Sequence, residues 1–131
     1  MKRFGILNAP IAEVLASMGH TDSLAIADCG LPIPNEVRRI DLAIKKGLPS
    51  FLEVLTAVAA DMFIEKIILA QEIQEKNPGI LKAVQDVLPG ITMEFVPHSV
   101  FKEQTRCCKA VVRTGEATPY ANIILVSGVS F

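Results

Sequence analysis

The sequence predicts a single three-layer α/β/α domain, in which a mostly parallel, mixed sheet of about six strands lies between two layers of helices. Two observations lead to this fold class. Short apolar runs bounded by turn residues alternate with segments of helical spacing through most of the chain. The 131 residues, of which 50% are hydrophobic, are enough for one core and too few for two ordinary domains. We therefore expect residues 1–131 to form one domain.

The chain begins with a predicted helix, strand and loop. Residues 10–18 are expected to be helical, because apolar residues recur at helical spacing after a proline, and Gly19 is placed to end the helix. The apolar run Leu24–Ala27 predicts a buried strand that ends at Asp28. A loop follows over Gly30–Pro34, because its two prolines continue neither a helix nor a strand ladder.

A second strand, a helix and a third strand follow in order. Residues 39–44 and 66–71 read as strands from their apolar content. Residues 50–60 read as a helix, in which Ser50 is the candidate N-cap and Glu53, three residues later, completes a capping box. The order strand, helix, strand is typical of a parallel sheet.

The remaining elements continue this alternation. Residues 78–88 have helical spacing that a Pro-Gly pair ends, and residues 92–96 read as a strand. Residues 99–106 are expected to form a short helix. Two further apolar runs predict strands over 110–113 and 123–126.

Charge and hydropathy exclude some classes of protein. The chain has 13 Lys and Arg against 14 Asp and Glu, a net charge of -1, so it lacks the basic surface of a nucleic-acid binder. Charged residues interrupt its densest apolar region, so no stretch approaches the roughly 18 residues that a membrane span requires. The mean hydropathy of +0.40 is high, which predicts self-association through apolar surface.

The cysteines indicate a reducing compartment. Cys29, Cys107 and Cys108 form neither an even disulfide set nor a C-x-x-C pair, and the adjacent two are interpreted as packing residues. Asn8 and Glu13 interrupt the apolar start of the chain, which argues against a secretory signal. We therefore expect a cytoplasmic protein.

Several polar residues are placed to meet at one rim of the sheet. His20 follows the first helix and Asp28 ends the next strand; a histidine beside a carboxylate can move protons near neutral pH, because imidazole titrates at roughly pH 6.5. His98 also follows the carboxyl end of a strand, where open α/β sheets bind ligands. Tyr120 and Asn122 precede the last strand, so they reach this rim only if that strand is antiparallel to its neighbours. Together, such groups can stack on a sugar and bind its hydroxyls.

Each candidate also has an ordinary structural interpretation. His20 can complement a helix macrodipole, and Asp28 before Cys-Gly can form a turn. His98 can lie exposed before a helix that Ser99 caps, and the tyrosine and asparagine can be ordinary buried residues. Lys102 could face the crevice, although a solvated lysine is commoner.

Other chemistries have no support in the sequence. The spacing of histidines and cysteines matches no zinc pattern, so we assign no metal. The glycines form neither of the phosphate-binding motifs, and no G-x-S-x-G turn is present for serine hydrolysis. We assign no cofactor.

Four segments of this chain together carry a resemblance to a known family. They are Gly19–Asp22, Ile26–Pro34, Pro97–Lys102 and Gly115–Asn122. On these segments the chain resembles the D-ribose pyranases, small sugar mutarotases with relatives that act on fucose. The resemblance runs from end to end, and these positions show no departure from it.

The resemblance implies a cytoplasmic enzyme that interconverts the β-pyranose and β-furanose forms of D-ribose, with His20 as the proton donor. It also implies a decamer of two stacked pentameric rings, with sugar clefts at subunit boundaries. The residues that it places in contact with the sugar are Asp28, His98, Tyr120, Ala121 and Asn122.

Our hypothesis for the reaction is general acid–base catalysis without a covalent intermediate. Asp28 would orient the ring of His20 and stabilise its imidazolium, and His98 would be the partner base. Three alternatives remain: a non-catalytic sugar-binding module, a mutarotase for another sugar such as L-fucose, and a structural ring protein whose polar rim is incidental.

Overall fold

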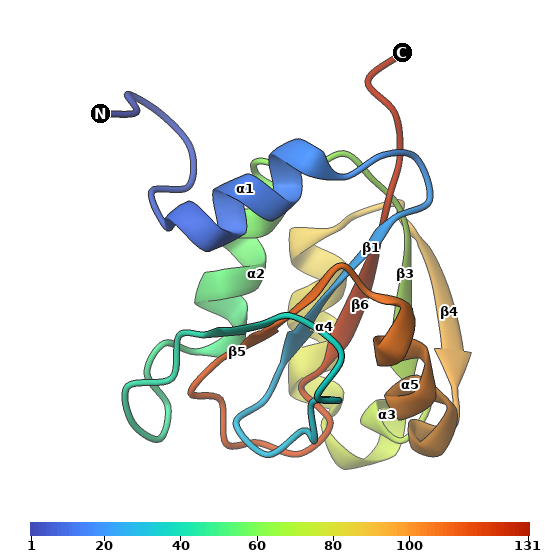
Figure 1. The fold of residues 1–131 in the computed structure, drawn as a ribbon. Helices are drawn as coiled ribbons and strands as arrows, with labels where there is room; N and C mark the ends of the chain where they lie inside the picture. Colours follow the sequence, from blue (N-terminus) through green and yellow to red (C-terminus); the bar gives the residue numbers. More distant parts are fainter.

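In the computed structural model, which describes residues 1–131, strands and helices alternate along the chain as the sequence predicts (Figure 1). The strands are β1 (Ser23–Ala27), β2 (Arg39–Asp41), β3 (Ile64–Ala70), β4 (Thr92–Val96), β5 (Ala110–Arg113) and β6 (Ile123–Ser127). The helices are α1 (Ala9–Ser17), α2 (Phe51–Ala59), α3 (Ile73–Lys76), α4 (Pro78–Val87) and α5 (His98–Gln104), followed by a 3-10 turn, Thr105–Cys107.

The six strands form one mixed sheet in the order β2-β5-β1-β6-β3-β4. All strands run in the same direction except β6, which pairs antiparallel with β1 on one side and with β3 on the other. Because β6 runs in the opposite direction, the residues that precede it lie at the same rim as the residues that follow β1. This is the arrangement that the sequence requires if Tyr120 and Asn122 are to meet Asp28.

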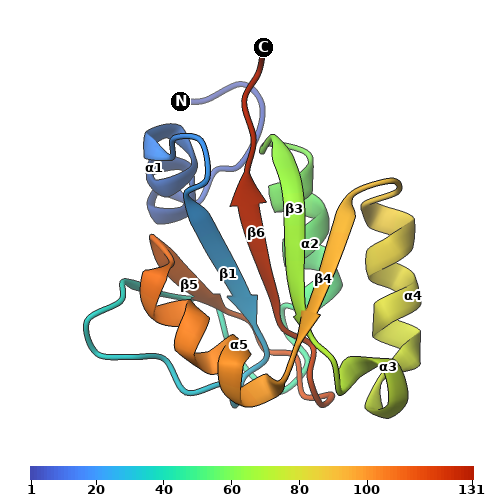
Figure 2. The ribbon, with the colours of Figure 1, turned by 90° about the vertical axis from the view of Figure 1, so that its right-hand side faces the viewer.

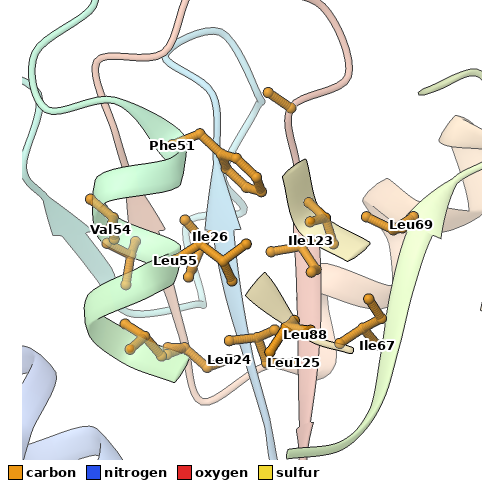
Figure 3. Close-up of a cluster of buried hydrophobic side chains, with 14 of the residues drawn as sticks. Leu24, Ile26, Phe51, Val54, Leu55, Ile67, Leu69, Leu88, Ile123 and Leu125 are labelled. Carbon is orange, nitrogen blue, oxygen red and sulfur yellow. The ribbon is translucent and has the colours of Figure 1, made fainter. Parts of the chain in front are cut away.

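The helices cover the two faces of the sheet unequally. The larger cluster of buried residues lies under α1, α2, α3 and α4, whereas α5 and the loop after β1 cover the other face. Figure 2 shows α5 in front of the sheet and α2 behind it. In Figure 3, Phe51 and Leu55 of α2 lie against Leu24 and Ile26 of β1. Full burial of such a side chain stabilises the fold by roughly 1.5–3 kcal/mol.

The helix starts follow the expected capping chemistry. The Ser50 hydroxyl accepts the backbone N–H of Glu53, and the Glu53 carboxylate accepts the N–H of Ser50, so the predicted capping box is confirmed. At the starts of α1 and α4, the side-chain oxygens of Asn8 and Asn77 each accept one backbone N–H, without the reciprocal bond. None of these helices has the length and apolar character needed to cross a bilayer.

The structure corrects three details of the predicted elements. The strand expected over 39–44 stops at Asp41, because the Asp41 carboxylate accepts the N–H of Ala43 at 3.0 Å and turns the chain away from the sheet. The four-residue helix α3 was not predicted. Helix α5 starts at His98 and Ser99 does not cap it, because the carboxylate of Glu72 accepts the first N–H instead.

Candidate functional site

Asp28 and Asn122 are joined by two hydrogen bonds where β1 ends and β6 begins. The backbone N–H of Asp28 donates to Oδ1 of Asn122 at 2.9 Å, and Nδ2 of Asn122 donates to Oδ2 of Asp28 at 2.8 Å. The N–H of Gly30 donates to the other carboxylate oxygen of Asp28 at 2.9 Å. Asn122 is fully buried, while Asp28 is half-buried, so the amide fixes the carboxylate at the surface of the rim.

His98 lies at the same rim, at the first position of α5. Both carboxylate oxygens of Glu72 accept its backbone N–H, at 3.0 and 3.1 Å. The His98 ring packs edge-on against Tyr120, with the ring centroids 5.1 Å apart, and stacks on Phe101 at 6.2 Å. These contacts determine where the imidazole lies.

The environment of His98 favours a neutral ring. Burial lowers its pKa below the ordinary value and the charge of Lys102 lowers it further, whereas Glu72 and Asp28 act in the opposite direction. Nδ1 of His98 is buried and has no hydrogen-bond partner. A neutral imidazole at the rim can accept a proton from a ligand.

Tyr120 adopts a left-handed backbone conformation, with φ of 57°, which few residues other than glycine adopt. The preceding loop is held by Asn77, whose Nδ2 donates to the carbonyl of Pro119 at 2.8 Å. Ala121, which follows Tyr120, is fully buried. A strained residue in a braced loop is typical of binding sites.

His20 lies at the opposite end of β1 from Asp28, beside Glu65. Its Nε2 is 2.9 Å from Oε2 of Glu65. The five residues of β1 alone span roughly 17 Å at about 3.3 Å per residue. The expectation that Asp28 orients the ring of His20 is therefore wrong within one chain, because the strand between them is extended.

Each end of the sheet has its own cleft. One of about 600 Å³ opens beside Asp28 and is lined by residues 28–30, 43–46, 113 and 115–119. Another, of about 500 Å³, is lined by His20 and the chain's C-terminal residues. Neither cleft is lined by both His20 and Asp28. No cluster of three side chains that could hold a metal ion is present.

The cysteines are all free, and only one of them lies in the core. Cys108 is buried, and burial raises its pKa to about 11, which keeps the thiol protonated. Cys107 is exposed, so its interpretation as a packing residue is wrong. The 3-10 turn at the end of α5 directs the two side chains to different surroundings.

Two carboxylates at these sites were missed in the sequence. Glu72 follows the carboxyl end of β3, so the strand-end rule that selects Asp28 and His98 applies to it as well. Glu65 contacts His20 from 45 residues further along the chain, and no local spacing indicates this contact.

The chain is similar to a well-defined group of proteins over its whole length. The family model described as the RbsD / FucU transport protein family matches residues 1–130. The D-ribose pyranase of Geobacillus kaustophilus (strain HTA426) is 57% identical over 131 residues, which cover 100% of this chain and 96% of that protein. The D-ribose pyranase of Bacillus cereus (strain ATCC 10987 / NRS 248) is 56% identical, with 100% of both chains covered.

Solved structures give the same result for the fold. The structure of Bacillus subtilis RbsD complexed with D-ribose has a TM-score of 0.98 at 46% identity and covers 100% of both chains. The fucose mutarotase from Streptococcus pneumoniae, in complex with L-fucose, has a TM-score of 0.83 over 100% of both chains. At 24% identity, the latter likeness shows a shared fold.

Proposed function

The chain belongs to the RbsD / FucU transport protein family, and from this premise we propose that it is a D-ribose pyranase, which interconverts the β-pyranose and β-furanose forms of D-ribose. Relatives named for this activity are 57% identical over the full chain, and the 46% identical RbsD binds D-ribose. The observation that carries the proposal for this chain is the rim at which Asp28, Asn122, His98 and Tyr120 converge.

The rim residues have distinct roles in this proposal. Asp28 binds sugar hydroxyls, because its hydrogen bonds with Asn122 leave carboxylate lone pairs free at the surface. Asn122, which is buried, holds that carboxylate toward the sugar. Tyr120 supplies an aromatic face. Ala121, the buried residue after it, is a sugar contact on the strength of the family resemblance. His98 is neutral near pH 7 and serves as the base, since burial lowers its pKa.

His20 is the proton donor, and it comes from a neighbouring copy of the chain. The length of β1 supports this arrangement, because it keeps His20 and Asp28 of one chain apart. A ring in which the His20 end of one subunit faces the Asp28 end of the next completes every site. We propose two such pentameric rings stacked into a decamer, located in the cytoplasm, with residues 1–131 as one sugar-mutarotase domain.

Ring opening then needs two proton transfers. The His20 imidazolium donates a proton to the ring oxygen as its bond to the anomeric carbon breaks, and His98 accepts the proton of the anomeric hydroxyl, which becomes the aldehyde oxygen. After rotation, the adjacent hydroxyl attacks the aldehyde and both transfers run in reverse. Positioned acid–base catalysis supplies about 10²- to 10⁴-fold, or roughly 3–5 kcal/mol of the barrier.

Saturation-transfer NMR on D-ribose tests the activity. The wild-type protein should accelerate exchange between the ring forms at catalytic concentration without changing their final proportions, whereas a non-catalytic binder leaves the exchange rate unchanged. His20→Ala and Asp28→Asn should each lower the exchange rate by about 10²-fold or more. Unchanged exchange in His20→Ala contradicts the proposed acid, and faster exchange with L-fucose than with D-ribose contradicts the proposed substrate.

Mixing these two inactive variants tests the shared site. In a randomly mixed oligomer, about one quarter of the sites combine an intact His20 with an intact Asp28 from different chains, so about a quarter of the activity should return. If the two residues act from the same chain, mixed oligomers stay inactive.

A further inference from the structure

His20, the proposed proton donor, contacts a carboxylate to which the proposed mechanism gives no role, that of Glu65. Oε2 of Glu65, near the start of β3, lies 2.9 Å from Nε2 of His20. Asp28, the residue expected in this role, is bonded to Asn122 at the other end of β1. The geometry therefore leaves Glu65 as the carboxylate in contact with the His20 ring.

The backbone holds both partners in place. The N–H of Thr21, next to His20, donates to the carbonyl of Ser127 at 2.9 Å, and the N–H of Gly128 donates to the carbonyl of Phe63 at 2.9 Å. The end of β6 thus braces the loop that carries His20 and the segment that carries Glu65. The absence of a side chain at Gly128 lets the end of β6 approach Glu65 closely, because a Cβ on residue 128 would lie only 3.3 Å from the Cβ of Glu65.

The contact determines which ring nitrogen is available for chemistry. An ionised carboxylate only accepts hydrogen bonds, so Nε2 of His20 must carry the hydrogen that Glu65 accepts. In the neutral imidazole this leaves the lone pair on Nδ1, and in the imidazolium it leaves the Nδ1–H as the free donor. The same ring nitrogen then serves for proton donation and for proton return.

We propose that Glu65 is the positioning residue of His20: it holds the imidazole as the Nε2–H tautomer, so that Nδ1 exchanges the proton with the sugar. This inference rests on the proposed function. Glu65 also stabilises the imidazolium as it forms, the role that a carboxylate plays beside a catalytic histidine.

A stabilising surface ion pair is the competing interpretation, and kinetics distinguish the two. In the single chain the side chains of His20 and Glu65 are 54% and 42% exposed, and an exposed pair of this kind contributes about 0–1 kcal/mol to the stability of that chain. Loss of Glu65 should therefore change the ring's tautomer and the rate while the stability changes little. The chain contains a matched control, since Glu94 is 43% exposed and lies 2.9 Å from Lys66.

The experiment compares wild type, Glu65→Gln and Glu94→Gln in the assembled protein. The chain has only 2 histidines, so long-range ¹H–¹⁵N spectra, assigned with His20→Ala, report the His20 tautomer directly. We expect Nε2–H in wild type and in Glu94→Gln, and a mixture of tautomers in Glu65→Gln. The kcat of ribose exchange should fall at least about tenfold in Glu65→Gln, and by no more than the roughly 10²- to 10⁴-fold that acid–base catalysis supplies, while KM stays constant. Glu65→Asp should recover part of kcat.

A wild-type Nδ1–H tautomer, or a kcat of Glu65→Gln equal to that of Glu94→Gln, overturns the proposal. If Glu65→Gln fails to assemble by size-exclusion chromatography, the wild-type tautomer and the Glu65→Asp kinetics decide in its place. A wild-type protein without exchange activity refutes the proposed function instead, and the tautomer still reports whether Glu65 holds His20.

Discussion

Replacing Asn122 by alanine should loosen the sugar-binding rim, because it removes both hydrogen bonds to Asp28. The backbone N–H of Asp28 then loses its partner, which costs about 1–3 kcal/mol when the donor is buried. The bond to the carboxylate, made to a charged group, contributes about 1.5–3 kcal/mol. Because Asp28 is only half-buried and water replaces part of this bonding, we expect Asn122→Ala to lose about 2–4 kcal/mol of the free energy of unfolding.

Urea denaturation at a fixed protomer concentration measures this loss, since the stability of an oligomer depends on concentration. Asn35→Ala is the control, because Asn35 is exposed and should change stability by less than about 0.5 kcal/mol. A double-mutant cycle with Asp28→Ala should give a coupling of about 1 kcal/mol or more. If Asn122→Ala is as stable as Asn35→Ala, the two hydrogen bonds do not hold the rim and the reasoning is refuted.

Four further predictions concern the same fold. Lys102→Met should raise the midpoint of the His98 ring titration followed by NMR, because Lys102 lowers the pKa of His98; an unchanged midpoint contradicts this. Since the folded-state pKa of His98 lies below the unfolded value of about 6.5, stability should decline as the pH falls below 6.5, as denaturation across pH can measure. Gly115→Ala should lower the free energy of unfolding, measured by urea denaturation, by about 1–3 kcal/mol or more, because the added Cβ would lie 2.4 Å from the backbone oxygen of Leu48. Gly79→Ala is the control: its Cβ meets no atom within 4 Å, so the free energy of unfolding should not fall. Phe101→Ala should lower the free energy of unfolding by about 3–5 kcal/mol in the same measurement, since Phe101 is fully buried. A decrease of less than about 1 kcal/mol is inconsistent with its packing.

The central strands were predictable because they are buried on both faces. β1 and β6 are almost uninterrupted apolar runs, so residue type alone locates them. The lengths of edge strands and the ends of helices depend on contacts that cannot be read from residue type. β2 is shorter than predicted because the Asp41 side chain bonds the backbone after it, and α3 is too short for helical spacing to be recognised.

The site was predictable only where residues follow strand ends. Asp28 and His98 lie at the rim that the parallel strands define, as expected. His20 was placed at that rim although it precedes β1, and the direction of the strand takes it to the other end. Its contact with Glu65 forms only when β6 brings distant segments together, so composition and spacing contain no sign of it.

The central position of β6 also constrains how the chain folds during translation. β6 is the last strand in chain order, yet it alone joins β1 to β3. Until the ribosome has released residues 123–127, the nascent polypeptide has two incomplete sheets, β2-β5-β1 and β3-β4, each with an unpaired edge. Such edges are templates for aggregation, so the sheet stays vulnerable until β6 has been inserted between β1 and β3.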